Sequence, residues 1–272
     1  MNPPERVVFM GAGNMTEALV RGLLAAGLAT AKDLVVTDIA PARLEHFRAR
    51  YGVAGSSDNA AAARAADVIV LAVKPQQLAD VCRALAGALE RDPLVISIAA
   101  GILTARIEEA LGGAARVVRA MPNTPALVGA GITAIAPGRR ATAADLNLAE
   151  RLLGAAGAVV RVGEEDLDAV TAVSGSGPAY VFYLAEAMRE AASQLGLSLD
   201  VADALVRRTI LGAGRLLEAE AGTLPEELRR RVTSKGGTTE AAVSELEARK
   251  VREAFVAAVI AAAARARALS RV

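Results

Sequence analysis

The sequence predicts an α/β protein in two parts, a doubly wound domain over residues 1–164 and an all-α domain over residues 165–272. In the first part, short runs rich in Val and Ile alternate with helical periodicity, which is typical of βαβ units and a parallel sheet. Beyond about residue 164, helical periodicity continues with almost no strand signal. The 272 residues are 53% apolar, and much of this apolar content is alanine, which favours closely packed helices.

The expected strands are short apolar runs, and several are uninterrupted, as in strands buried on both faces. They cover residues 6–10, 34–38, 68–73, 94–98 and 116–120, with shorter runs over 131–135 and 158–162 closing the domain. Helical periodicity covers 14–26, and Pro41 opens a further helix at its first turn. In the second part, long Ala-rich helices are expected over 178–195, 200–219 and 240–268. These helices are unusually apolar, which predicts a dimer or a larger assembly.

Charge and rare residues exclude several classes of function. The net charge is +1 with acids and bases interspersed, which argues against nucleic acid or an anionic membrane as the main partner. The chain has one Cys, Cys82, in an apolar helical setting typical of a buried thiol, and one His, His46. We therefore expect no disulfide, no structural metal site and no Cys–His nucleophile pair.

We expect a soluble, cytoplasmic protein. The first residues carry no apolar signal core. The longest strongly apolar stretch, residues 254–264, is too short to span a bilayer of about 30 Å.

A glycine motif follows the first expected strand and opens a helix, which is the context of a Rossmann-type dinucleotide site. Gly11 permits a tight turn, and Gly13 lets a pyrophosphate approach the backbone at the helix N-terminus. The third position of the motif, usually Gly or Ala, is Thr16. A plain strand–helix turn is the alternative.

Other candidate cofactor residues follow the later strands. Asp38 stands where an acid binds the adenosine ribose hydroxyls, which favours NADH over NADPH, although Arg43 is close enough to soften that preference. Lys74 and Ala100 follow strands whose carboxyl ends form the ligand crevice. The alternatives are a helix cap for Asp38 and a surface lysine for Lys74.

Three further segments differ from ordinary connections: the proline-framed Met121–Pro125, the small-residue turn Ser174–Tyr180 and the glycine-rich turn Thr233–Glu240. The last offers backbone N–H groups and hydroxyls suited to a carboxylate, although a simple helix cap is the alternative. These three segments, with Gly11–Met15 and Ala72–Pro75, stand in the order seen in pyrroline-5-carboxylate reductases, and the chain resembles that family over essentially its whole length.

The resemblance implies reduction of 1-pyrroline-5-carboxylate to L-proline with NADPH or NADH, the last step of proline biosynthesis. It also implies an all-α dimerisation domain, with a homodimer and often a homodecamer of five dimers. The implied cofactor contacts are Gly11, Ala12, Gly13, Asn14, Met15, Thr16, Asp38, Asn59, Val73, Lys74 and Ala100. The implied substrate contacts are Ser234, Gly237, Thr238 and Thr239, with Glu220 as a further candidate near the substrate.

The sequence departs from the family pattern at a few positions. Thr16 replaces the usual Ala, and Lys235 stands where Pro is common in the signature turn. Arg231 stands where some members carry an Asn that contacts the cofactor.

The reaction places modest demands on acid catalysis, because an imine is itself partly protonated near neutral pH. We expect the N–H groups of Gly237, Thr238 and Thr239 to hold the carboxylate with help from Ser234, and the Thr239 hydroxyl to orient the imine nitrogen. Thr239 and Ser234 are thus the candidate catalytic residues. Two rival readings are a β-hydroxyacid-dehydrogenase-like enzyme, disfavoured because residues 163–231 lack a catalytic Lys, and a non-catalytic dinucleotide sensor.

Overall fold

The computed structural model describes residues 5–270, which group into two compact units. One unit runs up to Ser176 and also takes in the chain from Ala262 on, and the other comprises Gly177–Ala261. The boundary expected at residue 164 therefore lies inside the first unit, and as a domain boundary it stays a prediction.

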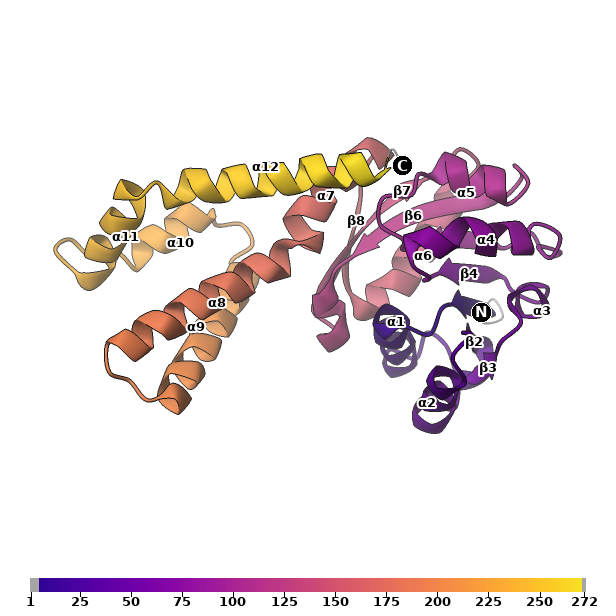
Figure 1. Ribbon diagram of the computed structural model, residues 1–272, viewed down its shortest axis with the longest axis horizontal. Coiled ribbons are helices and arrows are strands. Elements are labelled where there is room, and N and C mark those ends of the chain that lie inside the picture. The colour runs from indigo at the N-terminus through magenta and orange to yellow at the C-terminus, as the bar shows by residue number, and fades with distance from the viewer. Residues whose placement is uncertain (1–4, 271–272) are drawn as a thin grey trace. The chain divides into compact units, whose positions relative to one another are not determined.

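Strands and helices alternate along most of the first unit (Figure 1). Its strands are β1 (Val7–Met10), β2 (Leu34–Thr37), β3 (Ala54–Ser56), β4 (Val68–Leu71), β5 (Leu94–Ser97), β6 (Arg116–Pro122), β7 (Gly131–Pro137) and β8 (Gly157–Arg161). Its helices are α1 (Asn14–Ala25), α2 (Pro41–Tyr51), α3 (Asn59–Ala63), α4 (Pro75–Leu85), α5 (Thr104–Ala110), α6 (Ala143–Leu153) and α7 (Leu167–Val170). Shorter turns are η1 (Ala31–Asp33), η2 (Thr124–Val128), η3 (Gly154–Ala156), η4 (Glu164–Asp166) and the π-type turn η5 (Thr171–Gly175).

Within residues 5–270, the strands form one sheet in the order β3-β2-β1-β4-β5-β6-β7-β8. Strands β1 to β6 run parallel, β7 is antiparallel to β6, and β8 is parallel to β7. The chain order reverses between β1 and β4, so the loops after these two strands border the crevice where such sheets bind ligands. The predicted doubly wound α/β fold is confirmed.

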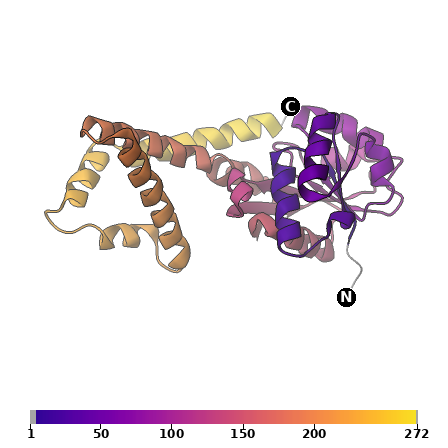
Figure 2. The ribbon, with the colours of Figure 1, turned by 90° about the horizontal axis from the view of Figure 1, so that it is seen from below.

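Helices cover both faces of this sheet (Figures 1 and 2). Val7 and Phe9 of β1 face the core formed with α1, α2 and α6, whereas Val8 and Met10 face the core formed with α3, α4 and α5. This alternation follows from the two-residue period of a strand, and it explains why the strands read as continuous apolar runs. Cys82 of α4 lies in the second core, as expected, where burial raises the pKa of its thiol to about 11.

The second unit is helical. It contains α8 (Gly177–Gln194), α9 (Leu199–Ala219), α10 (Pro225–Arg231), α11 (Thr238–Ala248) and most of α12 (Val251–Ser270). An ion pair of 3.0 Å joins Arg189 of α8 to Asp203 of α9, and the ring of Tyr180 packs edge-on against Phe255 of α12. The prediction of a single helix over 240–268 is wrong. Two helices, α11 and α12, are separated by a break at Lys250, whose φ of 55° is left-handed.

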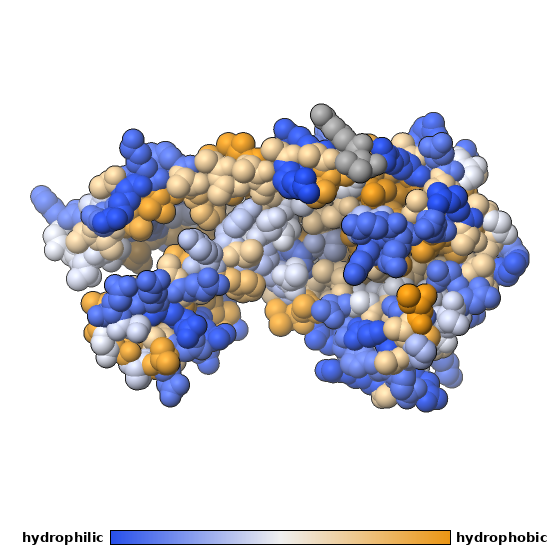
Figure 3. Space-filling model, viewed as in Figure 1, coloured by the Kyte–Doolittle hydropathy of each residue, from blue (hydrophilic) through white to orange (hydrophobic). Residues whose placement is uncertain are grey.

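Few apolar side chains of the second unit are buried, and many large ones are exposed. The buried apolar residues described there are Ala202, Val206 and Leu228. Several exposed apolar side chains lie on α12, among them Phe255, Val256 and Ile260. The surface of this helix is largely apolar (Figure 3).

No helix in the part of the chain that the structure describes has both the length and the apolar character needed to cross a membrane.

Candidate functional site

The loop after β1 can be formed only with glycine at position 11. Gly11 has a φ of 107°, and its N–H donates to the Thr37 carbonyl at 2.8 Å. A Cβ at this position would lie 2.7 Å from the carbonyl oxygen of Ala72, in the loop after β4. Gly11 therefore lets the ends of β1 and β4 approach closely, at the point where the sheet order reverses.

Gly13 meets a different requirement. It is extended, exposed and caps α1, and a Cβ on it would meet nothing within 4 Å. The N–H groups of Asn14 and Met15, in the first turn of α1, have no acceptor within their own helix and carry the positive end of its dipole. This open space beside helix N–H groups fits a pyrophosphate.

Ala12 and Thr16 are buried within the loop rather than exposed on it. The Thr16 hydroxyl donates to the Gly11 carbonyl at 2.6 Å, and this bond stabilises the turn. This contact shows how a threonine is accommodated at a position that usually holds a smaller residue. Direct contact of either residue with a cofactor stays a prediction.

Asp38 follows β2 and is half-buried at the same edge of the sheet. Its Oδ2 accepts the N–H of Ala12 at 2.9 Å, and its Oδ1 accepts the N–H of Ala40 at 2.9 Å, just before α2. Asp38 thus ties the glycine loop to the residue before α2, but it does not cap that helix: the N-cap is Ala40, and no side chain caps the first turn. A carboxylate oxygen can accept more than one hydrogen bond, and so Asp38 can still receive ribose hydroxyls.

The other predicted cofactor residues lie at this same carboxyl edge. Asn59 begins α3, and its Oδ1 accepts the Thr37 hydroxyl at the end of β2. Val73 and the exposed Lys74 follow β4, and the exposed Ala100 follows β5. A helix N-terminus for phosphates, an acid for hydroxyls and small residues for a flat ring together fit a nicotinamide dinucleotide.

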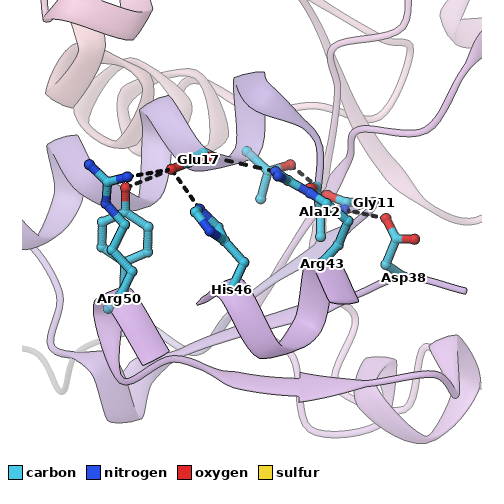
Figure 4. A network of polar contacts seen from close by, with 9 residues as sticks. Gly11, Ala12, Glu17, Asp38, Arg43, His46 and Arg50 are labelled. Atoms are coloured by element: carbon cyan, nitrogen blue, oxygen red, sulfur yellow. Dashed lines mark hydrogen bonds and ion pairs between the residues drawn. The ribbon is translucent and has the colours of Figure 1, made fainter. Parts of the chain in front are cut away.

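A cluster of polar side chains beneath the loop was not expected from the sequence (Figure 4). Glu17 of α1 lies 2.8 Å from the His46 ring, 2.9 Å from the Tyr51 hydroxyl and 3.5 Å from Arg43, all three on α2, with Arg50 at 3.8 Å. Burial raises the pKa of Glu17, but the hydrogen bonds from His46, Tyr51 and Arg43 outweigh burial and lower it. Glu17 stands in the first turn of α1, where acids are common, and nothing in its spacing pointed to partners on α2.

The proline-framed segment Met121–Pro125 packs against the turn near Ser174 within the first unit. Asn123 donates from Nδ2 to the Ser174 carbonyl at 3.2 Å and accepts the N–H of Ile132 at 2.9 Å. A Cβ at Gly175 would lie 2.7 Å from the end of the Met121 side chain. Two segments that the sequence singled out separately therefore form one contact, which explains the small residues of the second.

The glycine-rich turn in the second unit precedes α11. Gly236 has a φ of 72°, and its N–H donates to the Glu240 carboxylate at 2.7 Å. The N–H of Gly237 donates to the Ser234 carbonyl at 3.0 Å, and a Cβ on Gly237 would lie 2.5 Å from the Ser234 hydroxyl oxygen. Gly237 therefore closes the turn, so its own N–H is already engaged.

The remaining donors of this turn face outward. Ser234 and Thr238 are exposed and Thr239 is half-buried, and the N–H groups of Thr238 and Thr239 open α11 without intrahelical acceptors. Hydroxyl groups beside free N–H groups at a helix N-terminus are suited to a carboxylate.

Glu220 ends α9 and has its own partners. Its Oε2 accepts hydrogen bonds from Arg231 at 2.5 Å and from the Thr223 hydroxyl at 3.3 Å. The pKa of Arg231 is raised, chiefly by this hydrogen bond. The proposed proximity of Glu220 to the substrate stays a prediction.

Comparison with known families places both parts of the chain. Residues 164–269 match the family described as pyrroline-5-carboxylate reductase dimerisation, and residues 6–101 match the one described as NADP oxidoreductase coenzyme F420-dependent. The pyrroline-5-carboxylate reductase of Methanosarcina acetivorans is 40% identical over 267 residues, covering 98% of both chains. That of Pseudomonas aeruginosa is 44% identical over 245 residues, covering 89% of both chains.

Solved structures give the same relationship. A pyrroline-5-carboxylate reductase from Coxiella burnetii superposes with a TM-score of 0.93 at 42% identity, covering 99% of this chain and 100% of that one. The Plasmodium falciparum pyrroline carboxylate reductase with NADP bound has a TM-score of 0.86 at 29% identity, covering 98% of both chains.

Proposed function

Because the chain belongs to the pyrroline-5-carboxylate reductase family, it reduces 1-pyrroline-5-carboxylate to L-proline with NAD(P)H, and we propose that the turn Ser234–Thr239 holds the substrate. The observation that carries this proposal is the arrangement of the turn, where exposed hydroxyls stand beside the free N–H groups of α11. The loop that contains Gly11 and Gly13 is assigned to the cofactor, because the N-terminus of α1 beside Gly13 is open.

The bound reduced nicotinamide supplies a hydride to the imine carbon. The cofactor is assigned to the first turn of α1, to Asp38 and Asn59, and to the small residues after β4 and β5. The main contribution of these residues is to position the cofactor, which can account for about 7–11 kcal/mol of barrier reduction.

The substrate carboxylate is assigned to the N–H groups of Thr238 and Thr239 and the hydroxyl of Ser234. Gly237 is not assigned as a donor, since its N–H already donates to the Ser234 carbonyl. Its lack of a side chain instead leaves room for the Ser234 hydroxyl. The Thr239 hydroxyl is assigned to the imine nitrogen, where it orients the ring for hydride transfer.

Replacing Thr239 tests this assignment. Thr239→Ala removes the hydroxyl and should lower kcat/KM for pyrroline-5-carboxylate by about ten- to a hundredfold, the range of one lost hydrogen bond to a charged partner. Steady-state kinetics, following absorbance of the reduced nicotinamide, measures the change. Thr239→Ser keeps the hydroxyl and should stay within a few-fold of the wild type; an unchanged kcat/KM in the alanine variant would refute the role.

The chain forms homo-oligomers through its dimerisation domain. A dimer that assembles further into a decamer of five dimers is part of the proposal, and it is supported by the exposed apolar side chains of the second unit. A cytoplasmic location is also proposed, since the reaction draws on the cell's pool of reduced nicotinamide.

A further inference from the structure

We propose that Glu17 sets the cofactor preference of this enzyme, by holding Arg43 away from the adenosine 2′-position so that the site selects NADH over NADPH. This inference rests on the proposed cofactor site. It assigns a specificity role to a side chain on α1 that faces α2 rather than the carboxyl edge of the sheet.

The residue Ala12 is held from both sides (Figure 4). Its N–H donates to Asp38 at 2.9 Å, and its carbonyl accepts the Nε–H of Arg43 at 2.7 Å. The guanidinium of Arg43 also reaches Glu17 at 3.5 Å and lies over the Phe47 ring, 5.7 Å from its centroid. The Arg43 side chain is thus directed toward Ala12 of the glycine loop and toward α1.

The Glu17 carboxylate is the anion that this arginine meets. Its side chain is only 19% exposed, and it faces Arg43, His46, Arg50 and the Tyr51 hydroxyl. These partners lower the pKa of Glu17, so it stays ionised at neutral pH and keeps an opposite charge beside Arg43.

The consequence for the cofactor follows from charge. A 2′-phosphate adds a charge of about −1.5 to −2 at the end of β2, where the Asp38 carboxylate repels it. Arg43, in the first turn of α2, is the cation placed to relieve that repulsion, but it is engaged by Ala12 and Glu17. The ribose hydroxyls of NADH, in contrast, are good donors to Asp38.

Equilibrium binding tests the inference independently of turnover. Isothermal titration calorimetry with NAD⁺ and NADP⁺ should give a Kd for NADP⁺ at least ten times weaker than that for NAD⁺ in the wild type. Glu17→Gln removes the anionic partner of Arg43 and one negative charge but keeps the bond from Arg43 to the Ala12 carbonyl, and it should tighten NADP⁺ binding at least fivefold while leaving NAD⁺ within about twofold.

Glu45→Gln is the matched control. Glu45 is an exposed carboxylate on α2 that pairs with Arg48, so the charge change is the same but Arg43 keeps its partners. This variant should bind both cofactors as the wild type does. An equal gain in NADP⁺ affinity here would overturn the inference, because overall charge alone would then explain it.

Two further variants separate the mechanism from folding effects. In Glu17→Gln/Arg43→Ala the gain in NADP⁺ affinity should vanish, since the arginine that we assign to the phosphate, Arg43, is then absent. Arg43→Ala alone should weaken both cofactors alike through the loss of the Ala12 contact, with their ratio within twofold. If Arg43→Ala weakened NADP⁺ selectively by more than fivefold, Arg43 would already serve the phosphate and the inference would fail.

Turnover measurements distinguish a failure of the role of Glu17 from a failure of the proposed substrate site. Reduction of pyrroline-5-carboxylate at saturating NADH with an unchanged cofactor ratio in Glu17→Gln would overturn only the role of Glu17. The expected shift in the cofactor ratio without any reduction of this imine would overturn the proposed substrate site and leave the role of Glu17 supported.

Discussion

Gly11 and Gly13 stand two positions apart but meet different needs. Gly11 has a left-handed backbone and close packing against Ala72, whereas Gly13 has an ordinary φ of −81° and empty space where a Cβ would lie. Both roles were predictable from the sequence pattern, because a strand followed directly by a helix requires a tight turn and leaves the helix N-terminus open.

Alanine substitutions should therefore separate stability from cofactor binding. Gly11→Ala meets a positive φ and a 2.7 Å contact, so it should lower both the free energy of unfolding, by about 2 kcal/mol or more, and cofactor affinity. Gly13→Ala should leave the unfolding free energy within about 1 kcal/mol and weaken cofactor binding at least tenfold. Urea unfolding and calorimetry measure the two quantities, and tight cofactor binding by Gly13→Ala would show that no phosphate lies there.

Glu17 makes stability depend on pH with a definite sign. Its pKa is lower in the folded protein than the ordinary value of 4.5, so its contribution is present above that pH and is lost as pH falls through the folded value. Glu17→Gln should thus lower the unfolding free energy by on the order of 1 kcal/mol at pH 7, with a smaller difference at pH 3. Urea unfolding at both values tests this, and a difference that grew toward acid would contradict it.

The elements divide into those that local sequence specifies and those that it does not. The apolar runs of β1, β2, β4, β5 and β6 were predictable, because a strand buried on both faces has few alternatives. The short edge strand β3 (Ala54–Ser56) carries no such run, and its pairing depends on β2. The partners of Glu17 were equally hidden, since they depend on how α1 and α2 pack together.

The break between α11 and α12 is the clearest failure of the periodic pattern. Helical periodicity continues through Arg249 and Lys250, and no glycine or proline marks the end of α11. The chain nonetheless turns with Lys250 in the left-handed region, which is costly for a residue with a Cβ.

Glycine at this break should stabilise the protein. Lys250→Gly relieves the left-handed strain and should raise the free energy of unfolding by about 1 kcal/mol, as measured by urea unfolding at a fixed protein concentration. Arg249→Gly is the matched control, because Arg249 has a φ of −84° and glycine there should be neutral or destabilising. A loss of stability in Lys250→Gly would mean that the Lys250 side chain makes a contact worth more than the strain.

At the scale of the whole molecule, the second unit has too little interior to account for its apolar content. Its large exposed side chains, on α8, α9 and α12, are the surface that we propose a second copy of the chain covers, in keeping with the match to a dimerisation family. Composition alone indicated this need, since a run of apolar helices without enough polar residues points to assembly. The boundaries of the interface were not predictable, because they depend on which faces meet.

A single charge on α12 should disrupt that assembly. Ile260→Glu places a carboxylate on a side chain that is 64% exposed in the single chain, so the monomer should fold normally. Burying an unpaired charge in an interface costs about 3 kcal/mol or more, which should weaken assembly at least a hundredfold. Sedimentation velocity should show smaller species, whereas Val128→Glu, on an exposed apolar residue outside the matched dimerisation region, should not. Unchanged sedimentation of Ile260→Glu would place the interface elsewhere.

The hydrogen bond from Tyr51 to Glu17 also gives the protein an optical property. The chain has no tryptophan and three tyrosines, of which Tyr51 lies in the first unit and Tyr180 and Tyr183 in the second. A phenol becomes a stronger acid when it is excited, and the Glu17 carboxylate 2.9 Å from the Tyr51 oxygen is placed to accept its proton, a transfer that quenches emission. We therefore expect weak emission from Tyr51 while α1 and α2 remain packed and stronger emission once they separate, so that tyrosine fluorescence would follow the unfolding of the first unit without an added label.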